Sequence, residues 1–347
     1  MRQELKIGKH KIGPGYPIFI TAEIGVTCNH DLNIAKELID VTSEAGADAV
    51  KFLLVFPDEF MSNKDVTFTY ETTRGVESVN MYEMFLQEKF TFDEWRELKQ
   101  YSDQKNVEMF ASVSTPSGIE YTEKLGLPAY KFSSWDFNYH PLWRKIARKN
   151  KPVIIDTGPV RMLDLAKVVN LLQEEGNDQA LLVHCVHTDN PEEINMRTIQ
   201  YLRRAFNSLV GYTSRGRNNI TDIMAVSMET VYMEKRLTLD RDLPGHHHIL
   251  ALEPDEFREY VRIIRDAQAS LGIYDLIPSR ADVEERPKWF RHVVANRAIP
   301  AGTILTEDLL EGKRPEAGIS PEHMDLLVGR TVKRDLKENE AVLWEDV

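Results

Sequence analysis

The first roughly 270 residues alternate between short apolar runs rich in β-branched residues and longer stretches with apolar residues at helical spacing. The apolar runs are, in chain order, PIFITAEIG, DAVKFLLV, VEMFASVS, LPAYKFSS, PVIIDTG, ALLVHCVH, SLVGYT and ETVYMEKRLT. Near-continuous apolar strands that alternate with helices are typical of a parallel sheet covered by helices. Eight such units predict a closed (β/α)8 barrel of the TIM type.

One connection in this pattern is too long for a single crossover helix. Residues 56–90, between the second and third strands, predict an inserted loop on the catalytic side of the barrel. Its two interpretations, a structural flap and a lid over the substrate, both stay open. The next helix has a clear start, because Thr91 and Glu94 form a capping-box pattern.

The pattern changes near residue 273. We therefore predict a barrel domain over 1–272, a linker over 273–289 and a small β-rich domain over 290–347, where turn sequences such as IPAGT separate short strands. A chain of 347 residues is also longer than one core usually holds.

Composition narrows the function classes. The net charge of −12 argues against nucleic acid as the main partner, since phosphate backbones are bound by basic surfaces. No stretch has the roughly 18 apolar residues that a membrane span needs, and the MRQELKIGKHKIG start lacks the apolar core of a signal peptide. The two cysteines, Cys28 and Cys185, are not spaced as a metal motif, so we expect a cytoplasmic protein.

Polar residues gather where the predicted strands end, which is the catalytic face of such barrels. In strand order they are Glu23, Lys51, Ser112, Lys131 with Ser134 and Asp136, Asp156 with Thr157, His184 with His187, Tyr212 with Thr213, and Glu234 to Arg236. Two lysines near hydroxyl groups predict an anion site, because both groups donate hydrogen bonds to phosphate oxygens. The alternative interpretation is a set of solvated edge residues.

Four segments carry a resemblance to a known family. AEIGVTCNHDLNIAKELIDVTSEAGADAVKF at 22–52, the segment 125–158 and LDRDLPGHHHILALEPDEF at 239–257 resemble the sialic acid synthases, in the family's order. The tail IPAGTILTEDLLEGKRPEAGIS is similar to the antifreeze-like (SAF) domain that these enzymes carry. The resemblance implies a synthase that condenses phosphoenolpyruvate with a sugar aldehyde, of the N-acetylhexosamine kind, to a 2-keto-3-deoxy acid.

The resemblance also implies residue roles. The groups that would hold phosphoenolpyruvate are Lys51, Ser112, Lys131, Ser134 and Thr213. Glu23 would assist proton transfer or orient the aldehyde, and Asp136 would contact the sugar side. Arg314 matches an arginine that reaches into the partner's site in a domain-swapped homodimer, and its alternative interpretation is a surface arginine. We add His187, Tyr212 and His247 as substrate-binding candidates.

The departures from the family concentrate at its metal site, where two histidines hold a divalent metal that polarises the aldehyde. GYTSR stands where the family has GYSDH, and EKRLTLD stands where it has EKHFTLD, so Arg215 and Arg236 replace both histidines. Arginine stays protonated and has no lone pair for a metal. His247 likewise replaces an aspartate that contacts the sugar.

Three hypotheses follow from these departures. The arginines polarise the carbonyl in place of a metal, or they bind an extra anionic group on an altered acceptor, or the protein is a non-catalytic binding homologue. A different lyase or aldolase on the same barrel is a weaker hypothesis. A metal relocated to His184, His187 or the run His246–His248 is also weaker.

Overall fold

The computed structural model describes residues 1–87 and 89–347, and Glu88, within the predicted insertion, lies outside the described residues. The described chain divides into two compact units, Met1–Gly272 and Ile273–Val347. We treat each unit by itself.

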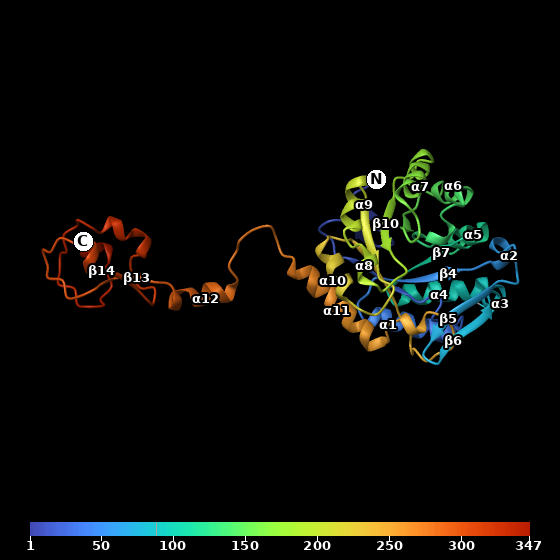
Figure 1. The fold of residues 1–347 in the computed structure, drawn as a ribbon, viewed down its shortest axis with the longest axis horizontal. Coiled ribbons are helices and arrows are strands. Elements are labelled where there is room, and N and C mark those ends of the chain that lie inside the picture. The colour runs from blue at the N-terminus through green and yellow to red at the C-terminus, as the bar shows by residue number, and fades with distance from the viewer. Residues whose placement is uncertain (88) are drawn as a thin grey trace. The chain divides into compact units, whose positions relative to one another are not determined.

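The first unit is a closed barrel of eight parallel strands, as the sequence predicted (Figure 1). Around the barrel the strands run β3 (Phe19–Glu23), β4 (Ala49–Leu54), β7 (Glu108–Val113), β8 (Tyr130–Phe132), β9 (Val153–Asp156), β10 (Ala180–Cys185), β11 (Leu209–Thr213) and β12 (Tyr232–Arg236), which pairs with β3 again. A short antiparallel hairpin, β1 (Leu5–Ile7) and β2 (His10–Ile12), precedes them. The sequence pattern had not predicted this hairpin.

Helices fill the crossovers and cover the outside of the strands. They are α1 (Leu32–Glu44), α4 (Phe92–Gln104), α5 (Pro116–Lys124), α6 (His140–Ala147), α7 (Met162–Glu174), α8 (Pro191–Ile194), α9 (Thr198–Phe206), α10 (Ile220–Ser227) and α11 (Pro254–Ser270), with short 3-10 turns at Ser134–Asp136 and His248–Leu250. The predicted capping box is formed, since the Thr91 hydroxyl accepts from the Glu94 amide and the Glu94 carboxylate accepts from the Thr91 amide. None of the helices in the described ranges has the length and apolar character to cross a membrane.

Strand residues alternate between two cores. Inward side chains such as Phe19, Phe110 and Leu181 fill the barrel, while their neighbours Ile20, Met109 and Leu182 pack outward against the helices. Because side chains alternate along a strand, this parity decides which strand-end residues enter the barrel mouth.

The insertion at 56–90 has its own structure: α2 (Pro57–Phe60), the hairpin β5 (Thr67–Thr72) and β6 (Gly75–Asn80), and α3 (Met81–Gln87). The hairpin packs on the segment that follows β12, because the Phe68 ring lies 5.3 Å from the His246 ring and Arg74 Nη2 donates to the Asp242 carbonyl over 2.8 Å. The insertion therefore walls one side of the barrel mouth.

The second unit begins at Ile273, the first residue of the segment predicted as a linker, and residues 280–289 of that segment form α12 (Arg280–Trp289). Beyond it, β13 (His292–Ala295) and β14 (Leu310–Lys313) pair antiparallel, with isolated bridges and 3-10 turns at Glu307–Leu309, Pro321–Leu326 and Trp344–Asp346. A separate core that includes Val293, Leu305 and Leu327 holds this unit together.

Candidate active site

The carboxyl ends of the barrel strands bring together the charged residues that parity directs inward. Strand pairing sets Arg236 beside Glu23, Glu23 beside Lys51 and Ser112 beside Lys131. The neighbouring Lys235 and His184 have the opposite parity, and Lys235 pairs with Asp222 of α10 behind the barrel. Sequence neighbours at the strand ends therefore belong to different environments.

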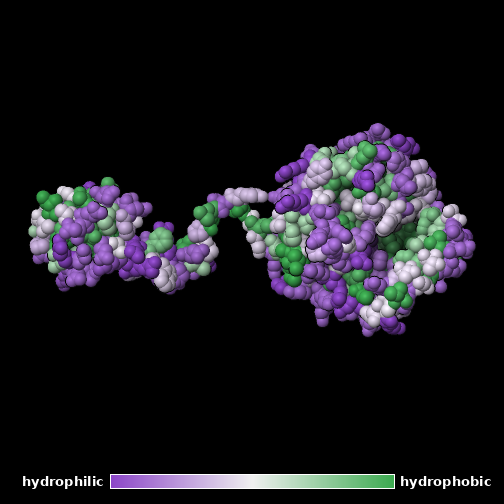
Figure 2. Space-filling view, in the orientation of Figure 1, coloured by the Kyte–Doolittle hydropathy of each residue, from purple (hydrophilic) through white to green (hydrophobic). Residues whose placement is uncertain are grey.

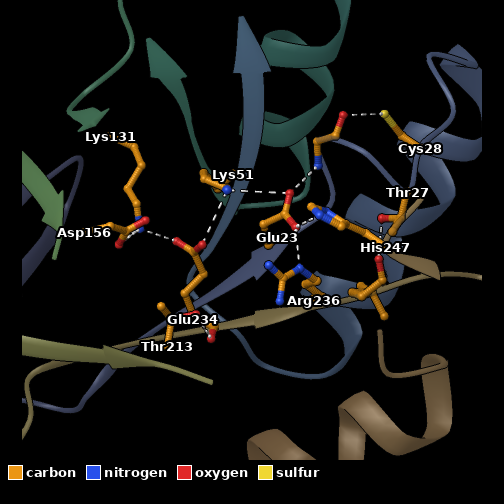
Figure 3. Close-up of polar contacts among 12 residues, drawn as sticks. Glu23, Thr27, Cys28, Lys51, Lys131, Asp156, Thr213, Glu234, Arg236 and His247 are labelled. Atoms are coloured by element: carbon orange, nitrogen blue, oxygen red, sulfur yellow. Dashed lines mark hydrogen bonds and ion pairs between the residues drawn. The ribbon is translucent and has the colours of Figure 1, made fainter. Parts of the chain in front are cut away.

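Lys131 occupies the centre of this site and has no exposed surface. Its Nζ lies 2.7 Å from Asp156 Oδ1 and donates to Glu234 Oε2 over 2.9 Å (Figure 3). Lys51 Nζ lies 3.4 Å from Glu234 Oε1 and 3.6 Å from Glu23 Oε1. Two lysines and three carboxylates thus form one continuous buried network, and we call this network, together with Arg236 beside Glu23, the charge cage.

Electrostatics within the cage set the charge of each member. Burial alone would lower the pKa of Lys131, but the adjacent carboxylates of Asp156 and Glu234 hold it well above its usual value. Burial would raise the pKa of Glu234, yet Lys131 and Lys51 lower it below its usual value, helped by the Tyr232 hydroxyl that donates over 2.6 Å. Asp156 goes the other way, because burial and the nearby Glu234 raise its pKa.

Arg236 stands at the other side of Glu23. Its Nε lies 3.5 Å from Glu23 Oε2, and its Nη1 donates to the Arg215 carbonyl over 2.9 Å. His247 Nδ1 lies 4.0 Å from the same Glu23 oxygen (Figure 3). Burial, together with the charge of Arg236, holds the pKa of His247 well below its usual value, so this ring is neutral. Of Arg236 and His247, which both lie near Glu23 Oε2, only the guanidinium of Arg236 is therefore charged.

The side chains around Glu23 do not fit a divalent metal. Arg236 offers only N–H donors, and the Arg215 side chain turns to Asp189, with Nη1 3.3 Å from Oδ2. The resemblance implies Mn²⁺ or Mg²⁺ held by two histidines, and neither histidine is present, which leaves Glu23 and His247 as the donors. Over residues 1–87 and 89–347, no three histidine, cysteine, aspartate or glutamate side chains gather as a metal-binding group.

The hydroxyl groups of the predicted anion site lie near the cage. Ser112 and Ser134 are buried, and the Thr213 hydroxyl donates to the Glu234 carbonyl over 3.0 Å. Gly158 makes room for Ser134: a Cβ at Gly158 would lie 2.2 Å from Ser134 Oγ and 3.2 Å from His187 Cε1. The turn after β9 therefore needs a glycine both for space and for its φ of +46°.

Replacement of Gly158 by alanine tests this packing, with Gly126→Ala as the matched control. Both positions have positive φ, so backbone strain should lower the free energy of unfolding of both variants by about 1–2 kcal/mol. Gly126 has open space around it, whereas Gly158→Ala displaces Ser134 and should lose a further ~1–3 kcal/mol. Urea unfolding measures both losses, and equal losses would contradict the packing argument.

Asp136 borders the site on the 3-10 turn that follows β8. Its Oδ2 accepts from the Ser114 hydroxyl over 2.6 Å. Burial raises the pKa of Asp136 more than this hydrogen bond lowers it. The Trp135 ring beside it is 68 % exposed and lies 4.9 Å from the His187 ring, so both rings are positioned at the mouth of the barrel.

A cavity of about 400 Å³ lies under the insertion, beside the mouth. It is lined by residues of the β3–α1 turn, the β5–β6 hairpin, α3 and the segment 244–246, including His30 and His246. Burial lowers the pKa of each of these histidines to about 4, so both rings are neutral near pH 7.

Two predicted site residues lie elsewhere. Tyr212 has outward parity and packs in the outer core, 5.9 Å from the His184 ring, so the structure does not bring it to the cage. Arg314 belongs to the second unit, where its guanidinium lies 5.4 Å from the Trp289 ring centroid. Conversely, Asp156 and Glu234 lie in the centre of the site. The sequence pattern placed both residues at strand ends but assigned neither of them a role. Their inward parity, shared with Ile154 and Tyr232, was the available signal.

Comparisons with known proteins find family matches over most of this chain. The NeuB family model matches residues 38–275, and the SAF domain model matches residues 290–347. N-acetylneuraminate-9-phosphate synthase of Homo sapiens is 31% identical over 340 residues, covering 96% of this chain and 94% of its own. N,N'-diacetyllegionaminic acid synthase of Legionella pneumophila is 28% identical over 341 residues, covering 96% of each chain. The crystal structure of N-acetylneuraminic acid synthetase from Leptospira borgpetersenii, in complex with citrate, matches with a TM-score of 0.72 and 27% identity over 82% of this chain and 95% of that one.

Proposed function

Because this chain belongs to the NeuB family, we propose that it joins phosphoenolpyruvate to a sugar aldehyde and releases inorganic phosphate. The observation that carries the proposal is the charge cage at the strand ends, where Lys51 and Lys131 stand with the Ser112 and Ser134 hydroxyls. Ammonium and hydroxyl donors suit the phosphate and carboxylate oxygens of phosphoenolpyruvate. The similar synthases of human and Legionella support the same reaction class.

The proposed reaction balances as an aldol-type condensation with water. C3 of the enol attacks the aldehyde carbon, water adds at C2, and the C2–O bond breaks as phosphate leaves. The product is a 2-keto-3-deoxy acid. The residues of this site lower the barrier by positioning the two reactants and by stabilising negative charge on oxygen. Glu23 lies between Lys51 and Arg236, where it orients the aldehyde or assists proton transfer to the aldehyde oxygen.

We assign to Arg236 the electrostatic role that a metal has in the relatives. Its contacts with Glu23 and the Arg215 carbonyl fix the guanidinium at the mouth of the barrel. A fixed positive charge in a site that excludes water polarises a carbonyl without reorganisation. Arg215 faces Asp189 rather than Glu23, and its side chain is 38% exposed, so it is placed to meet an anionic group on the acceptor. Asp136, His187 and His247 border the same mouth and would contact the acceptor.

The partner we propose for the chain is a second copy of itself. The segment that opens the second unit exposes apolar side chains: Leu276 is 96% exposed, and Ile273 and Ile277 are also exposed (Figure 2). Exposed apolar patches of this kind mark interaction surfaces. Together with the SAF match at 290–347, they support a domain-swapped homodimer in which Arg314 of each copy serves the barrel of the other.

The test is phosphate release from phosphoenolpyruvate across a panel of hexosamines, phosphorylated hexosamines and other aldehydes, with and without chelator. We expect release with at least one acceptor, unchanged by chelator. Release only with a phosphorylated acceptor would favour the anion-binding role of Arg215. Release that chelator abolishes would contradict the role of Arg236. No release with any acceptor, in a protein that still binds phosphoenolpyruvate, would favour the non-catalytic binding homologue.

A further inference from the structure

The charge cage has no net positive charge with which to attract an anion. Its cations are Lys51, Lys131 and, beside Glu23, Arg236, and its anions are Glu23, Asp156 and Glu234, so three positive charges meet three negative ones. A phosphate ester with a carboxylate brings about 2.5–3 negative charges near pH 7. Placing that charge in a buried neutral cage is costly unless the cage changes its own charge.

The carboxylate held least firmly is that of Asp156. Glu234 is contacted by both lysines and by the Tyr232 hydroxyl, and Glu23 by Lys51 and Arg236. Among the described residues, Asp156 has a single ion pair, to Lys131. Asp156 is therefore the member that can give up its charge with the smallest loss of contacts.

We propose that Asp156 takes up a proton when the phosphate-bearing substrate binds, so that Lys131 exchanges the Asp156 carboxylate for the phosphate of the ligand. This inference rests on the proposed function and names the residue through which that site adjusts its charge. The protonated carboxyl then donates a hydrogen bond to the bound anion instead of repelling it.

Among the charged and titratable groups around Asp156, Asp156 itself is the group that takes up the proton. Lys131 on β8 and Lys51 on β4 stabilise its charged form, and Glu234 on β12 opposes it. Burial raises the pKa of the Cys185 thiol on β10 to about 12, so that thiol stays neutral. Burial, with Glu234, already raises the pKa of Asp156 before any ligand binds. A phosphate at Lys131 adds a further negative charge beside it and raises this pKa again.

The sign of the pH dependence follows. Because the pKa of Asp156 is higher with ligand bound than without it, affinity is fully present below the ligand-free pKa and is lost as pH rises through the bound-state pKa. With one linked proton, the dissociation constant should rise about tenfold per pH unit in that window.

Titration calorimetry of phosphoenolpyruvate, in buffers of different ionisation enthalpy, measures the protons taken up. Between the ligand-free and the bound-state pKa of Asp156, we expect the wild type to take up about one proton more than Asp156→Asn, whose dissociation constant should follow only the ionisation of the ligand. Any proton uptake by the ligand itself is common to both proteins and cancels. Asp178→Asn is the matched control, since Asp178 is a surface carboxylate paired with Arg2, and it should behave as the wild type.

Inorganic phosphate as a second probe separates the two proposals. Asp156-dependent uptake with phosphate, without binding of phosphoenolpyruvate, would uphold the inference and overturn the proposed substrate. Binding of phosphoenolpyruvate with equal uptake in wild type and Asp156→Asn would overturn the inference and leave the proposed function standing. Binding of neither probe would overturn both. If Asp156→Asn does not fold, Asp156→Ser takes its place, and a wild-type count of zero still overturns the inference.

Discussion

Lys131→Met is expected to destabilise the barrel by about 3–5 kcal/mol and to abolish binding of phosphoenolpyruvate. The substitution leaves Asp156 and Glu234 facing each other at the fully buried centre of the cage, without the ammonium group that lies within 2.9 Å of both. Breaking a buried ion pair from one side is costly because the remaining charge is uncompensated. Urea unfolding measures the first effect and calorimetry the second.

The double variant Lys131→Met with Glu234→Gln separates stability from binding. Removing one of the two carboxylates together with the lysine relieves their repulsion, so part of the lost stability should return. Binding should not return, because the phosphate still lacks its cation. Lys51→Met is the matched single change and should cost less stability, since Lys51 Nζ lies 3.4 Å or more from its carboxylates. A Lys131→Met protein as stable as the wild type would refute the structure of the cage.

Arg236→Ala is expected to reduce the rate of phosphate release about 10²–10³-fold, which is the usual effect of removing one preorganised donor at a developing oxyanion. The reason is that Arg236 places a fixed positive charge beside Glu23, where the neighbouring His247 ring is neutral. The measurement is initial rate at saturating phosphoenolpyruvate with the acceptor that the panel identifies. Arg217→Ala is the control, because Arg217 lies on the loop that carries Arg215 but faces Glu256 of α11, and its rate should match the wild type.

Restoring the family's residues provides the converse test. The double variant Arg215→His with Arg236→His places an imidazole at each of the two positions where the resemblance implies a metal ligand, and its activity should become dependent on an added divalent metal. Metal stimulation of the wild type to the same degree, or an Arg236→Ala rate equal to that of the wild type, would contradict the assignment of Arg236.

The fold could be predicted because its signals are local. Each strand shows its apolar run in about six neighbouring residues, and eight such runs separated by helices leave few architectures. The anion site was predicted from the same kind of local signal, since Lys51 and Lys131 each lie within an apolar strand segment, and it stays a prediction. The insertion was recognised by its length, but its hairpin was not. Phe68 and Tyr70 alternate with polar residues in β5, whereas β6 is exposed along most of its length and gives little signal.

The sequence by itself determined the barrel, the second unit's family and the two arginines at the metal positions, all of which depend on residues read within one segment. It also contained the parity that turns Tyr212 outward and Glu234 inward. Only the tertiary structure decided which inward residues meet. Lys131 and Glu234 are 103 residues apart, and they touch because the strands of a closed barrel are tilted and staggered, which sets their ends at common levels. The same closure makes Asp156 and Glu234 neighbours of Lys131, so the lysine at the centre of the predicted anion site is paired with carboxylates.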